Sequence, residues 1–280
     1  MRKIIITIIF TILILYPVQS QDSNYRQAQM LSIKRLDSLS QDIYTALEEY
    51  RLIMLGEMHG TNEPVGFLIG LAELFAKNGD SVQIGFEIPE NQMQTFLTEH
   101  TEESLRNSAF FAENLTDGRA SAAWANAIAK LNKNPLITVF FYDVNNSQNF
   151  TVDVRDSIMY LNIKEQMEKH PAWRTITLSG NIHNMLVPFK GQKTTASFLI
   201  NDTTLKMKEK LCSLTHDYVS GTMLNNRGNG LELQHVEKSS FLSGFPDDVF
   251  LYLLSSDPKF PYHGIFFTRM VTASELLMSK

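Results

Sequence analysis

The fold is decided by residues 51–86, which read RLIMLGEMHGTNEPVGFLIGLAELFAKNGDSVQIGF. Residues 51–56 form a short apolar run that ends at a glycine, which is typical of a buried parallel strand. Residues 63–78 repeat apolar side chains at helical spacing, and Pro64 stands in the first turn, where a helix tolerates proline. Residues 81–86 form a second β-favouring run. The stretch therefore predicts a strand, a helix and a strand, the repeating unit of a parallel α/β sheet.

The same alternation continues along the rest of the chain. Strands are predicted at residues 136–142, 175–178, 195–200, 249–254 and 265–268. Helices are predicted at residues 90–99, 120–130 and 156–169, and in the Lys-rich segment 205–214. Strands separated by helices predict an α/β fold with a mostly parallel central sheet flanked by helices. Because neither an internal repeat nor an internal linker interrupts the pattern, residues 21–280 are expected to form a single domain.

Composition narrows the class of protein. The 280 residues are 44% hydrophobic and 20% charged, which is ordinary for a globular chain and excludes a disordered or fibrous one. Lys and Arg number 25 against 30 Asp and Glu, with no dense basic run, so a nucleic-acid partner is not expected. Cys212 is the single cysteine, which excludes an intramolecular disulfide and a CxxC metal knuckle. Any metal must therefore be bound by His, Asp and Glu.

The N-terminal residues 1–20 have the pattern of a secretory signal peptide. Arg2 and Lys3 precede an uncharged apolar run that ends near residue 18. This run is short for a membrane span, which needs roughly 20 residues, although an uncleaved N-terminal anchor is the alternative. We expect cleavage near Ser20, a mature chain without a stable membrane span, and a periplasmic or secreted location.

Polar side chains follow four of the predicted strands. Glu57 and His59 come after the first strand, Glu87 after the second, Asp143 after the third and His183 after the fourth. Ligands of parallel sheets bind outside the carboxyl ends of the strands, so these side chains are expected to share one rim. Each alone is as readily explained as a helix-start charge or a satisfied loop residue. Together, two imidazoles and several carboxylates suit activation of a water or an open site for Mn, Fe, Co or Zn.

Other motifs and residues give weaker evidence of a catalytic or binding site. The chain has no GxSxG elbow, no HExxH helix and no GxxxxGK[ST] loop. Cys212 is most simply a packed or exposed thiol, and His216, His235 and His263 are expected to be structural or on the surface. His263 precedes a predicted strand, which places it at the opposite end of the sheet unless that strand is antiparallel.

Four pieces of sequence, in order, resemble a known superfamily. They are LGEMHG at residues 55–60, GFEIPENQMQ at 85–94, Trp124 before the third strand, and the pair RD..M and GNIH at 155–159 and 180–183. They look like the superfamily that joins ChaN-like haem-uptake proteins, erythromycin esterase-like enzymes and Tiki/TraB-type proteins. The likeness covers residues 50–190.

The resemblance implies different activities in different branches. In the esterase-like branch, the residues that match Glu57, His59, Glu87 and His183 are catalytic. Tiki-type members are metal-dependent proteases in which similar residues bind the ion. ChaN-like members bind haem. One residue separates Glu57 from His59 where the esterases have two, and Gly180 stands where they often carry a histidine. Both departures favour the ChaN-like branch, whereas HGTNE at residues 59–63 is more esterase-like.

The first functional prediction is an exported hydrolase of an ester, lactone or amide bond in a small-molecule or peptide substrate. His59 would be the general base, Glu57 and Glu87 would orient the water or help hold a divalent metal, and His183 would complete the site. The metal, if bound, would be Mn, Co or Zn on Glu57, His59, Glu87 and His183. Arg155 would either hold an oxyanion or, as we slightly favour, pin a carboxylate in an ion pair.

The alternative prediction is a haem-binding protein of the iron-uptake type without catalysis. An axial ligand would come from Met58, a rim histidine, or one of Tyr142, Tyr218 and Tyr262. A third interpretation is a scaffold whose rim residues bind nothing. The sequence leaves the oligomeric state open.

Overall fold

The computed structural model describes residues 28–113, 117–144, 151–226, 230–254 and 260–277. The expected signal peptide at residues 1–20 lies outside these residues. Within them, no helix is both long and apolar enough to cross a membrane.

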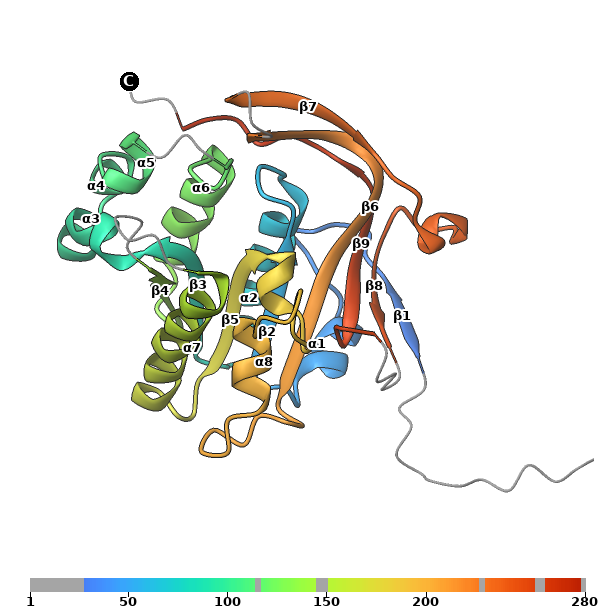
Figure 1. Ribbon diagram of the computed structural model, residues 1–280, viewed down its shortest axis with the longest axis horizontal. Coiled ribbons are helices and arrows are strands. Elements are labelled where there is room, and N and C mark those ends of the chain that lie inside the picture. Colours follow the sequence, from blue (N-terminus) through green and yellow to red (C-terminus); the bar gives the residue numbers. More distant parts are fainter. Residues whose placement is uncertain (1–27, 114–116, 145–150, 227–229, 255–259, 278–280) are drawn as a thin grey trace, which may run out of the picture.

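In the described part of the chain, nine strands form one sheet in the order β1-β8-β9-β6-β2-β5-β3-β4, with β7 paired to β6 (Figure 1). The strands are β1 (Gln29–Ser32), β2 (Leu52–Glu57), β3 (Val82–Pro89), β4 (Ile137–Asp143), β5 (Arg174–Gly180), β6 (Leu211–Asn226), β7 (Leu231–Glu237), β8 (Val249–Leu253) and β9 (Gly264–Val271). The six neighbours from β4 to β9 are all parallel. β1, β8 and β7 are antiparallel, so the parallel prediction is confirmed for the centre of the sheet and not for these three strands.

Helices cover both faces of the sheet. The α-helices are α1 (Gln41–Leu47), α2 (Glu63–Lys77), α3 (Gln94–Glu99), α4 (Glu102–Arg106), α5 (Ala109–Glu113), α6 (Ala122–Leu131), α7 (Val152–Lys169) and α8 (Thr195–Ile200). Short 3-10 turns are η1 (Glu90–Met93), η2 (Asn181–Asn184) and η3 (Phe241–Gly244).

Alternate residues of each strand point to opposite faces, and the core is divided accordingly. Ile53 and Leu55 of β2 pack with α2 and α6 on one face, whereas Leu52 and Met54 pack with α7 and α8 on the other (Figure 1). All six residues of β2 are buried. The near-continuous apolar run of residues 51–56 is thus explained by a strand covered on both sides.

Two predicted elements are wrong. Residues 195–200 form helix α8 rather than a strand, because Thr194 and Ser197 make a capping box and Ala196 and Leu199 pack against the core from one helical face. The segment around Cys212 is the start of strand β6 rather than a helix, since Leu211 and Cys212 pair in parallel with β2 and are buried.

The pattern missed β1, α1, β6 and β7 altogether. β6 is a long strand whose second half leaves the sheet centre and pairs with β7 at the top of the view (Figure 1). Its polar residues, among them Asp217, Asn225 and Asn226, hide the strand periodicity. Predicted helix 90–99 is present as η1 followed by α3.

Candidate functional site

The predicted rim lies at the carboxyl ends of four adjacent parallel strands. Glu57 is the last residue of β2, Asp143 ends β4, and Gly180 ends β5 opposite Glu57. The pairing of β3 with β4 shifts register between Phe86 and Pro89, the interval that contains Glu87. Such irregularities re-aim side chains at strand ends, and this one turns Glu87 into the centre of the cluster described below.

Glu57 and His59 form the first imidazole–carboxylate dyad. His59 Nδ1 lies 2.6 Å from Glu57 Oε1, and the Trp124 indole N–H donates to Glu57 Oε2 at 3.2 Å. Glu57 is buried, whereas the His59 side chain is 19% exposed. Because Nδ1 is held by the buried carboxylate, Nε2 is the nitrogen that faces the site. It lies 3.8 Å from Glu87 Oε2.

The environment of His59 favours its protonated form. Burial lowers the pKa of His59, but the hydrogen bond that Nδ1 donates to Glu57 and the negative charges of Glu87 and Glu57 outweigh it. The net result is a pKa raised above the ordinary value. The pair is therefore suited to accept a proton at Nε2 and to stabilise the imidazolium that results.

The C-terminal third of the chain holds the His59 loop. Gly60 O accepts hydrogen bonds from the amides of Leu224 in β6 and Ser274 after β9, at 3.1 and 2.9 Å. The Asn225 amide donates to His59 O at 3.2 Å. Gly60 has a φ of +82°, and a Cβ there would lie 1.8 Å from Leu224 O, so only glycine fits.

His183 and Asp156 form a second dyad. His183 Nδ1 lies 2.9 Å from Asp156 Oδ1, which also accepts from the Thr195 amide at 2.6 Å and its hydroxyl at 2.7 Å. Asp156 is fully buried. Arg155 Nη1 approaches His183 Nε2 at 3.3 Å, and since a guanidinium only donates, Nε2 accepts and Nδ1 carries the proton.

Glu87 occupies the centre, between the two dyads and two arginines. Its Oε1 accepts from Arg155 Nη2 at 2.5 Å and Arg119 Nη1 at 3.1 Å, and its Oε2 accepts from the Gly180 amide at 2.8 Å. Asp143 Oδ2 accepts from the same two guanidiniums, at 2.7 and 2.9 Å. Two buried carboxylates and two arginines thus neutralise each other.

This arrangement keeps Glu87 ionised. Burial raises its pKa, but the positive charges of Arg119 and Arg155 lower it further, and the pKa ends well below the ordinary value. The reciprocal effect raises the pKa of Arg119: burial lowers it, and Glu87, Asp117 and Asp143 more than compensate.

The predicted metal ligands do not fit a divalent ion as they are arranged. No group of three or more His, Cys, Asp or Glu side chains is placed to hold a metal in the described ranges. The physical reason is that Arg119 and Arg155 already neutralise Glu87, and both oxygens of Glu57 accept hydrogen bonds. A dication at this point would face two guanidiniums.

The candidate haem ligands differ in how they are engaged. The Tyr142 hydroxyl donates to Leu178 O at 2.8 Å, and the Tyr262 hydroxyl donates to Asn181 O at 3.1 Å. Tyr218 is buried, and Met58 packs against its cluster. Of the candidates, His59 combines partial exposure with a ring nitrogen that faces the site.

Sequence reasoning missed two side chains of the cluster. Arg119 is buried between Glu87 and Asp143, and Asp117 pairs with it at 2.7 Å. Neither residue directly follows a strand, and the sequence around them has no pattern that indicates a functional role. Asp156, considered only as the neighbour of Arg155, does leave a signal: it shares one face of α7 with Met159, Ile163 and Met167, so a carboxylate stands on an apolar stripe.

The remaining histidines lie outside the cluster. His216 is buried against Phe266 with Nε2 2.9 Å from the Thr268 hydroxyl, and burial lowers its pKa to about 3. His235 is exposed on β7. His263 precedes the parallel strand β9, but β9 begins partway along β6, so His263 lies at the level of Met54 in the middle of β2 rather than at the expected opposite end of the sheet; its Nδ1 accepts from the Ser213 amide.

The fold and the rim define an α/β protein with two imidazole–carboxylate dyads at the carboxyl edge of a parallel sheet. Three solved structures show what the fold is similar to. A Bacillus cereus protein aligns with a TM-score of 0.67 at 10% identity, over 89% of this chain and 96% of that one. A variant of the erythromycin esterase EreC in its open conformation aligns with a TM-score of 0.64 at 12% identity, over 90% of this chain and 100% of that one. ChaN of Campylobacter jejuni, solved with cofacial haem, gives 0.44 at 13% identity, over 71% and 92%.

The likenesses to the Bacillus cereus protein and to the erythromycin esterase show that the chain shares the fold of these two structures. At such identities they establish no activity, and a TM-score of 0.44 is too low for ChaN to support a functional conclusion. No family model matches the chain, and no curated protein matches it.

Proposed function

We propose that the protein hydrolyses an ester, lactone or amide bond in a small molecule or peptide, with His59 as general base. The observation that carries this proposal is the geometry of His59. Its Nδ1 is fixed by the buried Glu57 carboxylate, and its Nε2 faces Glu87 from a partly exposed position. The similarity of the fold to that of an erythromycin esterase supports hydrolysis as the reaction class and leaves the substrate open.

The reaction uses groups that are already positioned. The attacking water would bridge His59 Nε2 and Glu87 Oε2, which lie 3.8 Å apart. Its oxygen attacks the carbonyl carbon while Nε2 takes one proton. The tetrahedral intermediate then collapses, the C–O or C–N bond breaks, and the imidazolium returns the proton to the leaving group.

Arg155 serves this chemistry as an ion-pair partner. Its Nε and Nη2 bind Asp143, Nη2 also binds Glu87, and Nη1 faces His183. With these atoms committed, the guanidinium orders the carboxylate and the second imidazole rather than receiving an oxyanion. This is the role that the sequence slightly favoured.

The proposal is tested by replacing each rim histidine. His59→Ala and His183→Ala are assayed against aryl esters, lactones and peptides, with and without Mn²⁺ and Zn²⁺. His235→Ala is the matched control, because His235 is exposed on β7. We expect His59→Ala to lose on the order of 100-fold or more in kcat/KM and the control to stay unchanged. Activity that survives both rim substitutions contradicts the assignment.

A haem-binding role is the second candidate, and the site-facing Nε2 of the partly exposed His59 is the observation that favours it. Haemin is added to the purified protein and the visible spectrum is recorded. A ligated Soret band that disappears in His59→Ala supports this role. A spectrum identical to free haemin rejects it.

We also propose export, with residues 1–20 removed and residues 21–280 forming one domain. The support is the charge and hydropathy pattern of the N-terminal segment, together with one sheet that takes strands from β1 to β9. N-terminal sequencing of the protein recovered from a secreting host is expected to find a start just after Ser20.

A further inference from the structure

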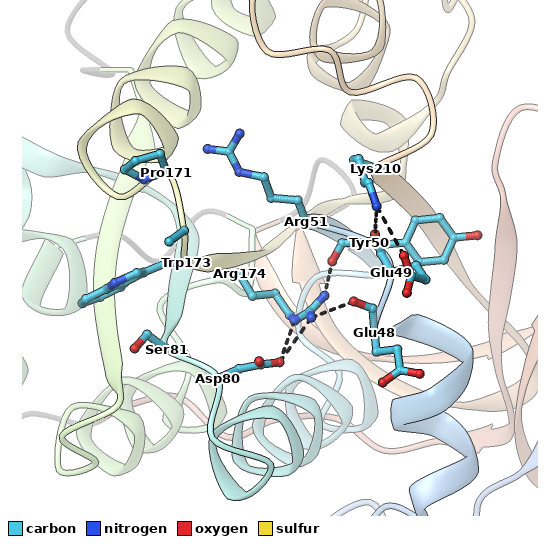
Figure 2. A pocket seen from close by; sticks show the side chains of 11 residues that line it. Glu48, Glu49, Tyr50, Arg51, Asp80, Ser81, Pro171, Trp173, Arg174 and Lys210 are labelled. Atoms are coloured by element: carbon cyan, nitrogen blue, oxygen red, sulfur yellow. Dashed lines mark hydrogen bonds and ion pairs between the residues drawn. The ribbon is translucent and has the colours of Figure 1, made fainter.

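A pocket lies at the amino ends of the parallel strands, opposite the rim. It has a volume of about 260 Å³ and is formed by the segments that precede β2, β3, β5 and β6. These contribute Arg51, Asp80, Trp173, Arg174 and Lys210, among others (Figure 2). Strand β2 runs from this pocket to Glu57, which separates the two places by about 20 Å at the usual rise per residue.

Most charges in this pocket are already paired. Arg174 binds Asp80 at 3.2 Å, donates to Glu48 O at 2.8 Å and to Tyr50 O, and stacks over the Phe75 ring. Lys210 pairs with Glu49 at 3.3 Å. Through these contacts Arg174 and Lys210 link the segments that precede the strands, so a structural role accounts for both side chains.

Arg51 is different. Its Nη2 donates to Met167 O at 2.8 Å, while its Nε is buried and has no acceptor among the described residues. Figure 2 shows its guanidinium extending away from the Arg174–Asp80 cluster, and no bond joins it to the other lining residues drawn.

Arg51 differs from the other arginines of the described residues in its charge partners. In the described part of the chain, six arginines form an ion pair with a carboxylate, and Arg51 does not; the six are Arg35, Arg106, Arg119, Arg155, Arg174 and Arg269. Burial lowers the pKa of the Arg51 guanidinium, with no carboxylate to oppose the effect. A half-buried cation without a counter-charge is costly, and an anion that enters the pocket relieves that cost.

We propose that this pocket binds a small molecule through an oxyanion, a carboxylate or phosphate group, held by Arg51. A planar guanidinium presents several donors to such a group and binds it in a fork. The volume of about 260 Å³ has room for a small ligand. Because the pocket lies at the amino ends of the strands and the rim at their carboxyl ends, this site is separate from the rim and does not depend on the proposed hydrolysis.

The experiment titrates the full protein with inorganic phosphate and, separately, with acetate, by calorimetry at constant ionic strength. Arg51→Gln removes the charge, and Arg51→Lys keeps the charge but loses the fork. Lys210→Gln is the matched control, since it removes a pocket cation that is already paired with Glu49. His59→Ala tests independence from the rim. Thermal unfolding of each variant verifies that it is folded.

We expect at least one anion to bind the wild type, with affinity about 10-fold or more weaker in Arg51→Gln and intermediate in Arg51→Lys. Lys210→Gln and His59→Ala are expected to bind within about 2-fold of the wild type. Tighter binding of phosphate identifies a phosphate-bearing ligand, and tighter binding of acetate a carboxylate. The proposal is overturned if neither anion binds the wild type, if a folded Arg51→Gln binds equally well, or if Lys210→Gln loses as much affinity.

Discussion

Glu57 performs two tasks at once at the residue scale. One carboxylate oxygen holds His59 Nδ1 and the other accepts from the Trp124 indole, so the carboxylate has a single orientation. The same negative charge helps raise the pKa of His59. Orientation and basicity of the proposed general base therefore depend on one side chain.

The first prediction follows from this coupling. A general base acts when neutral, so activity should rise with pH through a limb set by His59, above the ordinary histidine value of about 6.5. Glu57→Gln removes the negative charge, so we expect the pKa of His59 to fall, the limb to move to lower pH, and kcat to drop on the order of 100-fold. The pH dependence of kcat/KM and an NMR titration of the histidines measure both effects.

The control is Glu90→Gln, which removes an exposed carboxylate just after β3. It should leave the limb in place. An unshifted limb in Glu57→Gln would show that the dyad does not set the titration of the base.

At the scale of elements, the rim is held together by two segments that are distant from it in sequence, the far end of β6 and the segment after β9. They bind the backbone of residues 59–61 through Leu224, Asn225 and Ser274. Glu63, which opens α2, accepts from the Thr272 amide and hydroxyl at 2.9 and 2.6 Å. The C-terminal third thus fixes the position of the loop that carries His59.

Gly60→Ala tests this dependence. The left-handed backbone alone costs about 1–2 kcal/mol for alanine, and the clash of the new Cβ with Leu224 O adds about 1–3 kcal/mol. Gly79→Ala is the matched control, because Gly79 has a φ of +91° and a Cβ there meets no atom within 4 Å. We expect both variants to lose stability in urea unfolding and only Gly60→Ala to lose most of the activity. Equal losses in the two variants would contradict a close fit between β6 and the His59 loop.

At the scale of the whole molecule, the charged centre joins four parallel strands. Glu87 on β3, Asp143 on β4 and Gly180 on β5 meet through Arg119 and Arg155, and the Glu57–His59 dyad of β2 lies against them. Removing one partner of such a buried cluster leaves an uncompensated charge, which typically costs about 3–5 kcal/mol.

The third prediction concerns acid stability. The pKa of Glu87 is lowered in the folded state, so its contribution is present above the unfolded-state value of about 4.3 and is lost as the pH falls through the folded-state value. Glu87→Gln should therefore be less stable than the wild type by about 3–5 kcal/mol near neutral pH. The difference should shrink as the pH falls below about 4.3.

Urea unfolding at a series of pH values measures this difference. Glu99→Gln, the same change at an exposed carboxylate, should stay within about 0.5 kcal/mol of the wild type throughout. A Glu87→Gln deficit that does not change with pH would reject an ionised Glu87 as the source of the stability.

The sequence by itself determined the layout of the sheet centre and of the rim. Residues 51–56 and 81–86 are mostly apolar because strands covered on both faces must be, and residues 63–78 repeat at helical spacing because α2 packs against the sheet. Once the strands are parallel, Glu57, Glu87 and Asp143 must share one edge. Apolar runs and helical spacing are local, periodic properties, so they can be recognised in a single sequence.

Tertiary structure alone decided which charges meet. Trp124 reaches Glu57 across 67 residues, Arg119 reaches Glu87 across 32, and Thr195 fixes Asp156 across 39. No periodicity encodes such partners, because they depend on how separate elements pack. The same packing paired Glu87, one of the four expected metal ligands, with two guanidiniums, turned residues 195–200 into a capped helix, and left Arg51 without a carboxylate among the described residues.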